Sequence, residues 1–194
     1  MFKIRFSYLT LILIPIIFAG CQSGGMSKQQ QNWGVVHGGL VHDEHQTRAT
    51  RLCSALTAGA IREPIRIHVL ATAAPAAYSW SSRDIYVSTG LMDTLNDAQL
   101  TACIAHEIGH LINDRHCDGV AALQGHEGSN PDEEKAADAT GVRLLSVNHM
   151  PQEWLIEALQ TLHDSDSCAC PRTMLEDRIS TLKAALKVPN RSAE

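Results

Sequence analysis

The sequence of 194 residues predicts an α+β domain, mostly helical with a small β-sheet. Residues 64–70 and 84–88 alternate β-branched and polar side chains between turn residues, which is typical of short strands. Later stretches carry apolar residues at helical spacing, at 97–113, 131–146, 151–162 and 173–186. Apolar residues make up 44% of the chain, enough to fill one core.

Residues 1–20 are predicted to be a lipoprotein signal peptide. Lys3 and Arg5 form a positive start, and residues 7–19 are apolar with one proline. Small residues then precede Cys21, which resembles a bacterial lipobox, so Cys21 would be lipidated and become the first mature residue. An ordinary signal peptide or an uncleaved anchor remains the alternative, although the apolar run is short for a spanning helix.

The residues after Cys21 bear on location and partners. Gln22 and Ser23 follow it, so no aspartate occupies the second mature position. By resemblance to lipoproteins of Gram-negative bacteria, this favours a cell-envelope protein, lipid-anchored at the periplasmic face of the outer membrane. The net charge of −5 falls to −7 once Lys3 and Arg5 are removed. No basic stripe stands out, so the sequence predicts no nucleic-acid partner.

Residues 21–46 are predicted to be a flexible tether, because they are rich in Gly, Gln, Ser and His with little periodicity. His37, His42 and His45 could scavenge metal there, but a solvated polar tether is the favoured interpretation. The globular domain is then predicted to span residues 47–190.

The remaining elements are expected in a simple order. A helix is predicted over 47–60, then the strand 64–70, whose His68 is expected to be a surface or satisfied histidine. Residues 71–77 are a connection, and Tyr78 to Ser88 form a hairpin closed by Gly90. The helices named above follow, and no internal repeat is found.

The pentapeptide His106-Glu107-Ile108-Gly109-His110 is the most specific motif. Positions i and i+4 share one helix face, about 6 Å apart, so His106 and His110 can bind one metal ion together. This is the HExxH arrangement of zinc hydrolases, in which the glutamate is the general base. Glu107 would take a proton from the attacking water and pass it to the leaving amine. Gly109 would permit a close backbone approach or simple helix packing.

A zinc site for catalysis needs a third protein ligand. Glu134 is the candidate, because it lies in the first turn of the next predicted helix, after Pro131. Asp138 lies one turn further on the same face, where it could accept a hydrogen bond from a ligand histidine and set its tautomer. The candidate site therefore comprises the metal ligands His106, His110 and Glu134, with Glu107 and Asp138 assigned to catalysis.

The cysteines leave several possibilities open. Besides Cys21, the chain has Cys53, Cys103, Cys117, Cys168 and Cys170. An exported protein meets oxidising conditions, so disulfides are plausible, and an odd number leaves at least one thiol free or paired outside the chain. Cys103 lies one turn before His106 and is expected to pack as an apolar residue.

Several segments carry a resemblance to a known family. Residues 85–92 (IYVSTGLM), residues 97–100 (DAQL) and the motif HEIGH resemble the zinc metallopeptidases of the HtpX and CaaX-prenyl-protease type, which are gluzincins. The resemblance covers about residues 50–186. It implies a zincin-like fold, one Zn²⁺ per chain with Glu134 as third ligand, and a metalloendopeptidase acting on protein or peptide substrates. In zincins an edge strand also pairs with the extended substrate, which here points to Tyr78 and Trp80.

The resemblance implies one more site residue. The family often carries a late His-Pro pair followed by an arginine near the metal. Pro171 and Arg178 fit that pattern, so Arg178 is included among the catalytic candidates, whereas Cys170 stands where the histidine is usual. Cys170 could bind zinc as a thiolate, form a disulfide or do neither, and His149 or His163 could substitute for the missing histidine.

Three functions follow as hypotheses. The first is a membrane-anchored zinc endopeptidase that, as the resemblance implies, hydrolyses misfolded or misassembled envelope proteins. The second is a catalytically silenced metallopeptidase-like binding or chaperone lipoprotein. The third is a metal-buffering lipoprotein without hydrolytic activity.

Overall fold

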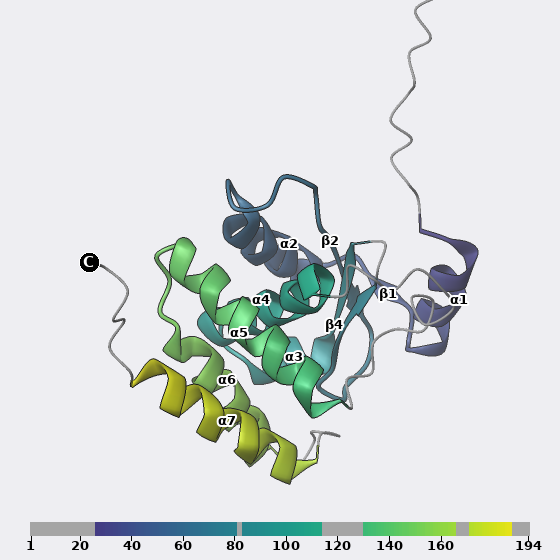
Figure 1. The fold of residues 1–194 in the computed structure, drawn as a ribbon. Helices are drawn as coiled ribbons and strands as arrows, with labels where there is room; N and C mark the ends of the chain where they lie inside the picture. Colours follow the sequence, from purple (N-terminus) through teal and green to yellow (C-terminus); the bar gives the residue numbers. More distant parts are fainter. Residues whose placement is uncertain (1–25, 81–82, 114–129, 166–170, 188–194) are drawn as a thin grey trace, which may run out of the picture.

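A four-stranded sheet forms one side of the domain, and a layer of helices covers one of its faces (Figure 1). The computed structural model describes residues 26–80, 83–113, 130–165 and 171–187. The predicted signal peptide, the lipidated Cys21 and three other cysteines, Cys117, Cys168 and Cys170, lie outside these residues. The α+β class, mostly helical with a small mixed sheet, agrees with the sequence-based prediction.

The sheet has the strand order β1, β2, β4, β3, with bounds Leu40–Val41, Arg66–Leu70, Asp84–Ser88 and Ala77–Trp80 respectively. Strands β2 and β4 are parallel, whereas β3 and β4 pair antiparallel as the predicted hairpin. The strand predicted at 64–70 and the hairpin are therefore confirmed. Strand β3 lies at the edge of the sheet, next to the helices.

The side chains of β4 alternate between the two faces of the sheet, as the two-residue period of a strand requires. Ile85 and Val87 join the main core beneath the helices. Tyr86 points to the opposite face, where it packs with Trp80 in a second apolar cluster. His68 stacks on Tyr86 and bonds to Asp84, so its prediction as a satisfied strand histidine is confirmed.

Helix α4 (Asp97–Asn113) runs through the centre of the helical layer. It packs against α2 (Glu44–Thr57), against strands β3 and β4 of the sheet, and against the later helices α5 and α6. Every residue from 100 to 110 is buried, including the motif. The sequence suggested an amphipathic helix here. The central position explains the difference, because a helix covered on all sides has no solvent face over these turns.

A short helix, α3 (Thr89–Thr94), follows β4 directly. The sequence-based prediction placed only a closing glycine there. Gly90 instead lies in the first turn of α3, and Ser88 is the N-cap whose hydroxyl accepts the amide of Leu91. A serine at this position satisfies an amide that a helix start otherwise leaves unpaired.

Three helices complete the layer: α5 (Pro131–Val147), α6 (Glu153–Asp164) and α7 (Arg172–Leu186). Each agrees with its predicted range to within two residues. Helix α5 begins with Asn130 as N-cap and proline in its first turn, followed by three acidic residues that suit the positive end of the helix dipole. Figure 1 shows α6 and α7 side by side beneath α5.

The described part of the predicted tether is ordered secondary structure, so the prediction of a flexible tether is wrong for residues 26–46. Helix α1 (Lys28–Val36) begins with a capping box between Ser27 and Gln30, and β1 follows it in the sheet. Trp33 packs edge-on against Trp80 and Tyr86 on the outer face of the sheet. Composition does not predict this element, because only the partly buried Trp33 and the buried Gln30 attach it to the domain.

Two further findings concern the sequence-based predictions. Among the described cysteines, Cys53 and Cys103 are both buried, and burial raises the pKa of Cys53 to about 11. No helix in the described ranges has the length and apolar character needed to cross a membrane.

Candidate metal centre

The two histidines of the motif and one glutamate from α5 converge on a single point. The Nε2 atoms of His106 and His110 lie 3.2 Å apart. One carboxylate oxygen of Glu134 lies 3.2 Å from Nε2 of His106, and the other lies 3.5 Å from Nε2 of His110. All three residues are buried. The i, i+4 spacing on α4 supplies the histidine pair, and the antiparallel neighbour α5 supplies the carboxylate.

These donor atoms fit one zinc ion. Zinc bonds of about 2.0–2.1 Å in a tetrahedral site place neighbouring ligand atoms roughly 3.3 Å apart. The separations above lie close to that value, with the two histidines approached by different oxygens of the Glu134 carboxylate, and one ligand atom from each residue lies within 4.8 Å of the others. In the part of the chain that the structure describes, this is the single group of three or more histidine, cysteine or carboxylate ligands close enough to share an ion. Two nitrogens and one oxygen also leave the fourth position that a catalytic zinc needs.

Asp138 sets the tautomer of His106. Its Oδ1 atom lies 2.9 Å from Nδ1 of His106, so the Nδ1–H group donates to the carboxylate. The lone pair of Nε2 then points to the converging ligand atoms. A carboxylate behind a ligand histidine in this way also makes the imidazole a stronger base toward a metal.

Arg178 of α7 joins both carboxylates of α5. Its Nε and Nη2 atoms donate to the two oxygens of Asp138 at 2.9 and 2.6 Å. Its Nη1 atom lies 2.8 Å from Oε2 of Glu134. The buried guanidinium therefore bonds to both carboxylates and fixes the orientations of Asp138 and Glu134. Arg178 also lines the cavity beside the candidate ligands, and its assignment to catalysis stays a prediction.

The charges of this network perturb each other's pKa values. Burial and Arg178 disfavour a charged His106, but the hydrogen bonds to Asp138 and Glu134 outweigh them and raise the pKa of His106 to about 9. Burial favours a neutral Glu134, yet the two histidines and Arg178 hold the pKa of that carboxyl far below its usual range. The pKa of Asp138 is lowered in the same way, against burial, by Arg178 and His106. In the metal-free protein the two carboxylates are therefore balanced by Arg178 and by a protonated His106, and a metal ion would take the place of the His106 proton.

Two glycines let α4 and α5 approach closely enough to form the site. A Cβ atom on Gly109 would lie 2.4 Å from the carbonyl oxygen of Ala137. A Cβ atom on Gly141 would lie 3.0 Å from the backbone nitrogen of His106. Gly109 is therefore a helix-packing glycine, and this packing is also what brings Glu134 to the histidines.

Glu107 and the three ligands line one cavity of about 140 Å³. Glu107 is 7% exposed. Among the described residues, none forms a hydrogen bond or an ion pair with its carboxylate in the structure. A carboxylate held beside the ligands, without a competing partner there, is placed to accept a proton from water at this point.

The rest of the cavity wall is largely apolar. Besides the ligands, Glu107 and Arg178, it is lined by Pro75, Ala76, Ala77, Leu91, Cys103, Leu155, Leu159, Leu162, Met174 and Leu175. The first three belong to the start of the edge strand β3, and the leucines of α6 form its opposite side. Helical spacing predicted the helix over 151–162, but spacing cannot show which cavity the helix borders.

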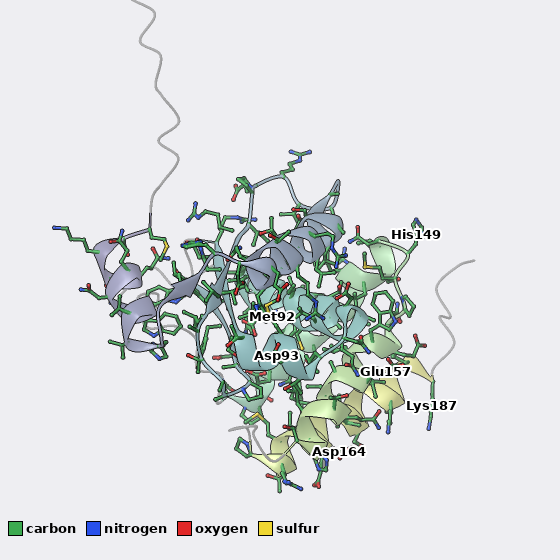
Figure 2. All side chains as sticks on the ribbon, turned by 180° about the vertical axis from the view of Figure 1, so that it is seen from behind. Met92, Asp93, His149, Glu157, Asp164 and Lys187 are labelled. Carbon is green, nitrogen blue, oxygen red and sulfur yellow. The ribbon has the colours of Figure 1, made fainter. Side chains whose placement is uncertain are left out.

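The structure also places three further residues that the sequence singled out. Cys103 packs in the main apolar core, as predicted, and it also lines the cavity. His149 lies in the turn between α5 and α6, at the end of α5 remote from Glu134 (Figure 2). His163 bonds to Asp164 and Glu176 on the surface. Neither histidine takes the place of the family's late histidine in this structure.

Comparison with known proteins adds one finding. Residues 43–127 match the model of Peptidase family M48. The matched segment includes β2, β3, β4 and the whole HExxH motif, and it ends before Glu134. The match supports a metallopeptidase, and zinc dependence is inferred from that family. A search of curated proteins found no match to this chain.

Proposed function

We propose that this protein is a zinc-dependent metalloendopeptidase of the HtpX and CaaX-prenyl-protease type. The observation that carries the proposal is the convergence of His106, His110 and Glu134 beside Glu107 in one cavity. The match to Peptidase family M48 over the motif supports the same reaction class. The single group of ligands in the described residues favours one catalytic ion over metal buffering.

The chain's own residues can carry out hydrolysis of a peptide bond. A bound zinc ion would lower the pKa of water from 15.7 to about 7 and polarise the scissile carbonyl. Glu107 would take one proton from the water as its oxygen forms the new C–O bond. The same side chain would return that proton to the amine as the C–N bond breaks. His106 and Glu134 meanwhile keep their geometry through Asp138 and Arg178.

The edge strand β3 can hold an extended substrate. Its first residue, Ala77, lines the cavity together with Pro75 and Ala76. An extended peptide added to such an edge would be held by backbone hydrogen bonds and would run past the metal ligands. Tyr78 is half-buried on this strand, whereas Trp80 is buried against α1, so Trp80 supports the strand from its far face.

We propose further that the protein is exported, lipid-anchored through Cys21 and located at the periplasmic face of the outer membrane. The apolar run at 7–19, the small residues before Cys21 and the residues after it support this. Substrates would be misfolded or misassembled envelope proteins, because only an unfolded segment can lie extended along β3.

The test compares the mature protein with the Glu107→Gln variant, each loaded with one equivalent of zinc. Unfolded casein is the substrate, and cleavage is followed by the release of new amines. Cleavage by the wild-type protein that is lost in Glu107→Gln, and lost on chelation, is the expected result. Equal inactivity of both zinc-loaded proteins would contradict the proposal and favour a silenced binding domain.

A further inference from the structure

Ser88 connects two walls of the cavity beside the metal ligands. It is the last residue of β4, and its side chain is fully buried. The Oγ atom accepts the backbone amide of Ala76 at 2.9 Å and that of Leu91 at 3.0 Å. Ala76 and Leu91 both line the cavity, one from the edge-strand side and one from α3. The Ser88 hydroxyl is therefore hydrogen-bonded to one residue in each of the two walls.

The backbone around Ser88 leaves little freedom for these walls to move independently. The amide of Ser88 donates to the carbonyl of Ala76 at 2.9 Å, and that of Gly90 donates to Thr72 at 2.9 Å. A Cβ atom on Gly90 would lie 1.9 Å from the carbonyl oxygen of Ala73. The connection before β3 is therefore in direct contact with the start of α3, and the Ser88 hydroxyl lies where the two segments meet.

The cavity has the size and chemistry to hold one side chain. Its volume is about 140 Å³. Sites for whole small-molecule ligands are about two to seven times larger, at roughly 300–1,000 Å³. An apolar cavity of roughly 150 Å³ holds one benzene molecule. The three leucines of α6 and Leu91 make a branched aliphatic side chain the natural occupant.

We propose that Ser88 is a positioning residue for substrate selection. Its hydroxyl sets the width of the cavity, and the cavity accepts one leucine-sized side chain of the peptide. The proposal rests on the proposed peptidase function and adds which side chain is accepted. Without the hydroxyl, the amides of Ala76 and Leu91 lose a shared acceptor inside the protein. An unpaired amide is costly at the buried Leu91 and less so at the partly buried Ala76, so the walls would shift apart to find other partners for the two groups. A wider cavity would discriminate less between large and small side chains.

The experiment measures binding, so that it does not depend on catalysis. The probes are two dipeptides capped with a hydroxamate, which differ only in the adjacent side chain, leucine in one and alanine in the other. Calorimetry gives the Kd of each probe for the zinc-loaded mature protein. The ratio of the two Kd values does not depend on the fraction of protein that is folded. A general loss of stability would therefore leave the ratio unchanged.

We expect the wild-type protein to bind the leucine probe at least roughly tenfold more tightly, as is typical of an apolar pocket that distinguishes small differences in side-chain size. Ser88→Ala should reduce the ratio to about threefold or less while zinc content stays at one per chain. Ser88→Cys keeps the size of the side chain but weakens the acceptor. It should shift the ratio in the same direction, and it serves as the measurement if Ser88→Ala does not fold.

Asn148→Ala is the matched control. Like Ser88, Asn148 makes two side-chain hydrogen bonds to the backbone, although as a donor, to the carbonyls of Leu56 and Leu144. Asn148 does not line the cavity. The variant should lower Tm and leave the ratio at the wild-type value. An unchanged ratio in both Ser88 variants, or a wild-type protein that does not distinguish the probes, would overturn the proposal. A failure of the wild-type protein to cleave casein would overturn the peptidase function instead, without affecting this ratio.

Discussion

Gly109 on α4 lies against the backbone of Ala137 on α5, so closely that a Cβ atom would meet the carbonyl oxygen at 2.4 Å. This contact lies between the ligands, one residue before His110 and three residues after Glu134. The separation of the two helices there decides whether the carboxylate reaches the histidines.

The Gly109→Ala variant should push α5 away from α4. Overpacking of this kind costs about 1–3 kcal/mol of unfolding free energy. We also expect weaker zinc binding, because Glu134 moves with α5. Chemical denaturation and a zinc competition titration measure the two effects. Gly34→Ala on α1 is the control, since its Cβ would lie 3.9 Å from the nearest side chain, and it should stabilise the protein slightly. Full zinc affinity in Gly109→Ala would contradict this account.

Asp138→Asn should weaken zinc binding while the fold persists. The amide can still accept a bond from His106, but it lacks the charge that strengthens the imidazole as a ligand and pairs with Arg178. Loss of such a partner typically costs about 10–100-fold in metal affinity. A competition titration with a chromophoric chelator measures it. The matched control is Asp132→Asn, an exposed carboxylate in the first turn of the same helix. Equal zinc affinities for the two variants would argue against a role of Asp138 behind the ligand.

Arg178→Met should destabilise the zinc-free protein more than the zinc-loaded protein. Removing one partner from a buried charge pair typically costs about 3–5 kcal/mol, because the other charge is left unpaired. Zinc would compensate for part of the loss by pairing with Glu134. Thermal unfolding with and without zinc gives the difference in Tm. Lys135→Met removes an ion pair with Asp177 at the surface and should change Tm little. An equal loss of Tm in both metal states would contradict the predicted coupling.

The affinity for zinc should rise with pH across the neutral range. His106 must be neutral to bind a metal, and in the metal-free protein its pKa is raised to about 9. Below that pH, zinc must displace one proton, so the apparent affinity should increase about tenfold per pH unit between pH 6.5 and 8.5. Titrations in buffers of different ionisation enthalpy would show the released proton.

The stability of the metal-free protein should follow the opposite trend. A folded-state pKa above the unfolded value of 6.5 contributes stability that is fully present below pH 6.5 and is lost as the pH rises through about 9. Denaturant midpoints at several pH values test the sign. A zinc affinity that does not change with pH would show that His106 is not protonated in the metal-free state.

Local patterns were enough to predict much of this protein. The strands at 66–70 and 84–88 follow from alternation and β-branched residues, and α4 to α7 follow from helical spacing. His106 and His110 share a face because the helix itself sets the i, i+4 relationship. Helix α1 could not be predicted this way, since its attachment depends on Trp33 reaching an aromatic cluster formed by other segments.

The sequence by itself therefore predicted the candidate metal-binding residues of α4, the candidate general base and the class of fold, because these depend on the regular geometry of a helix or strand. Only the tertiary structure decided that Arg178 braces the carboxylates from a helix 40 residues beyond Asp138, and that Ser88 holds two cavity walls. Such contacts join segments whose separation along the chain carries no periodic signal. They arise from close packing, here permitted by two glycines at the α4–α5 crossing and one at the start of α3.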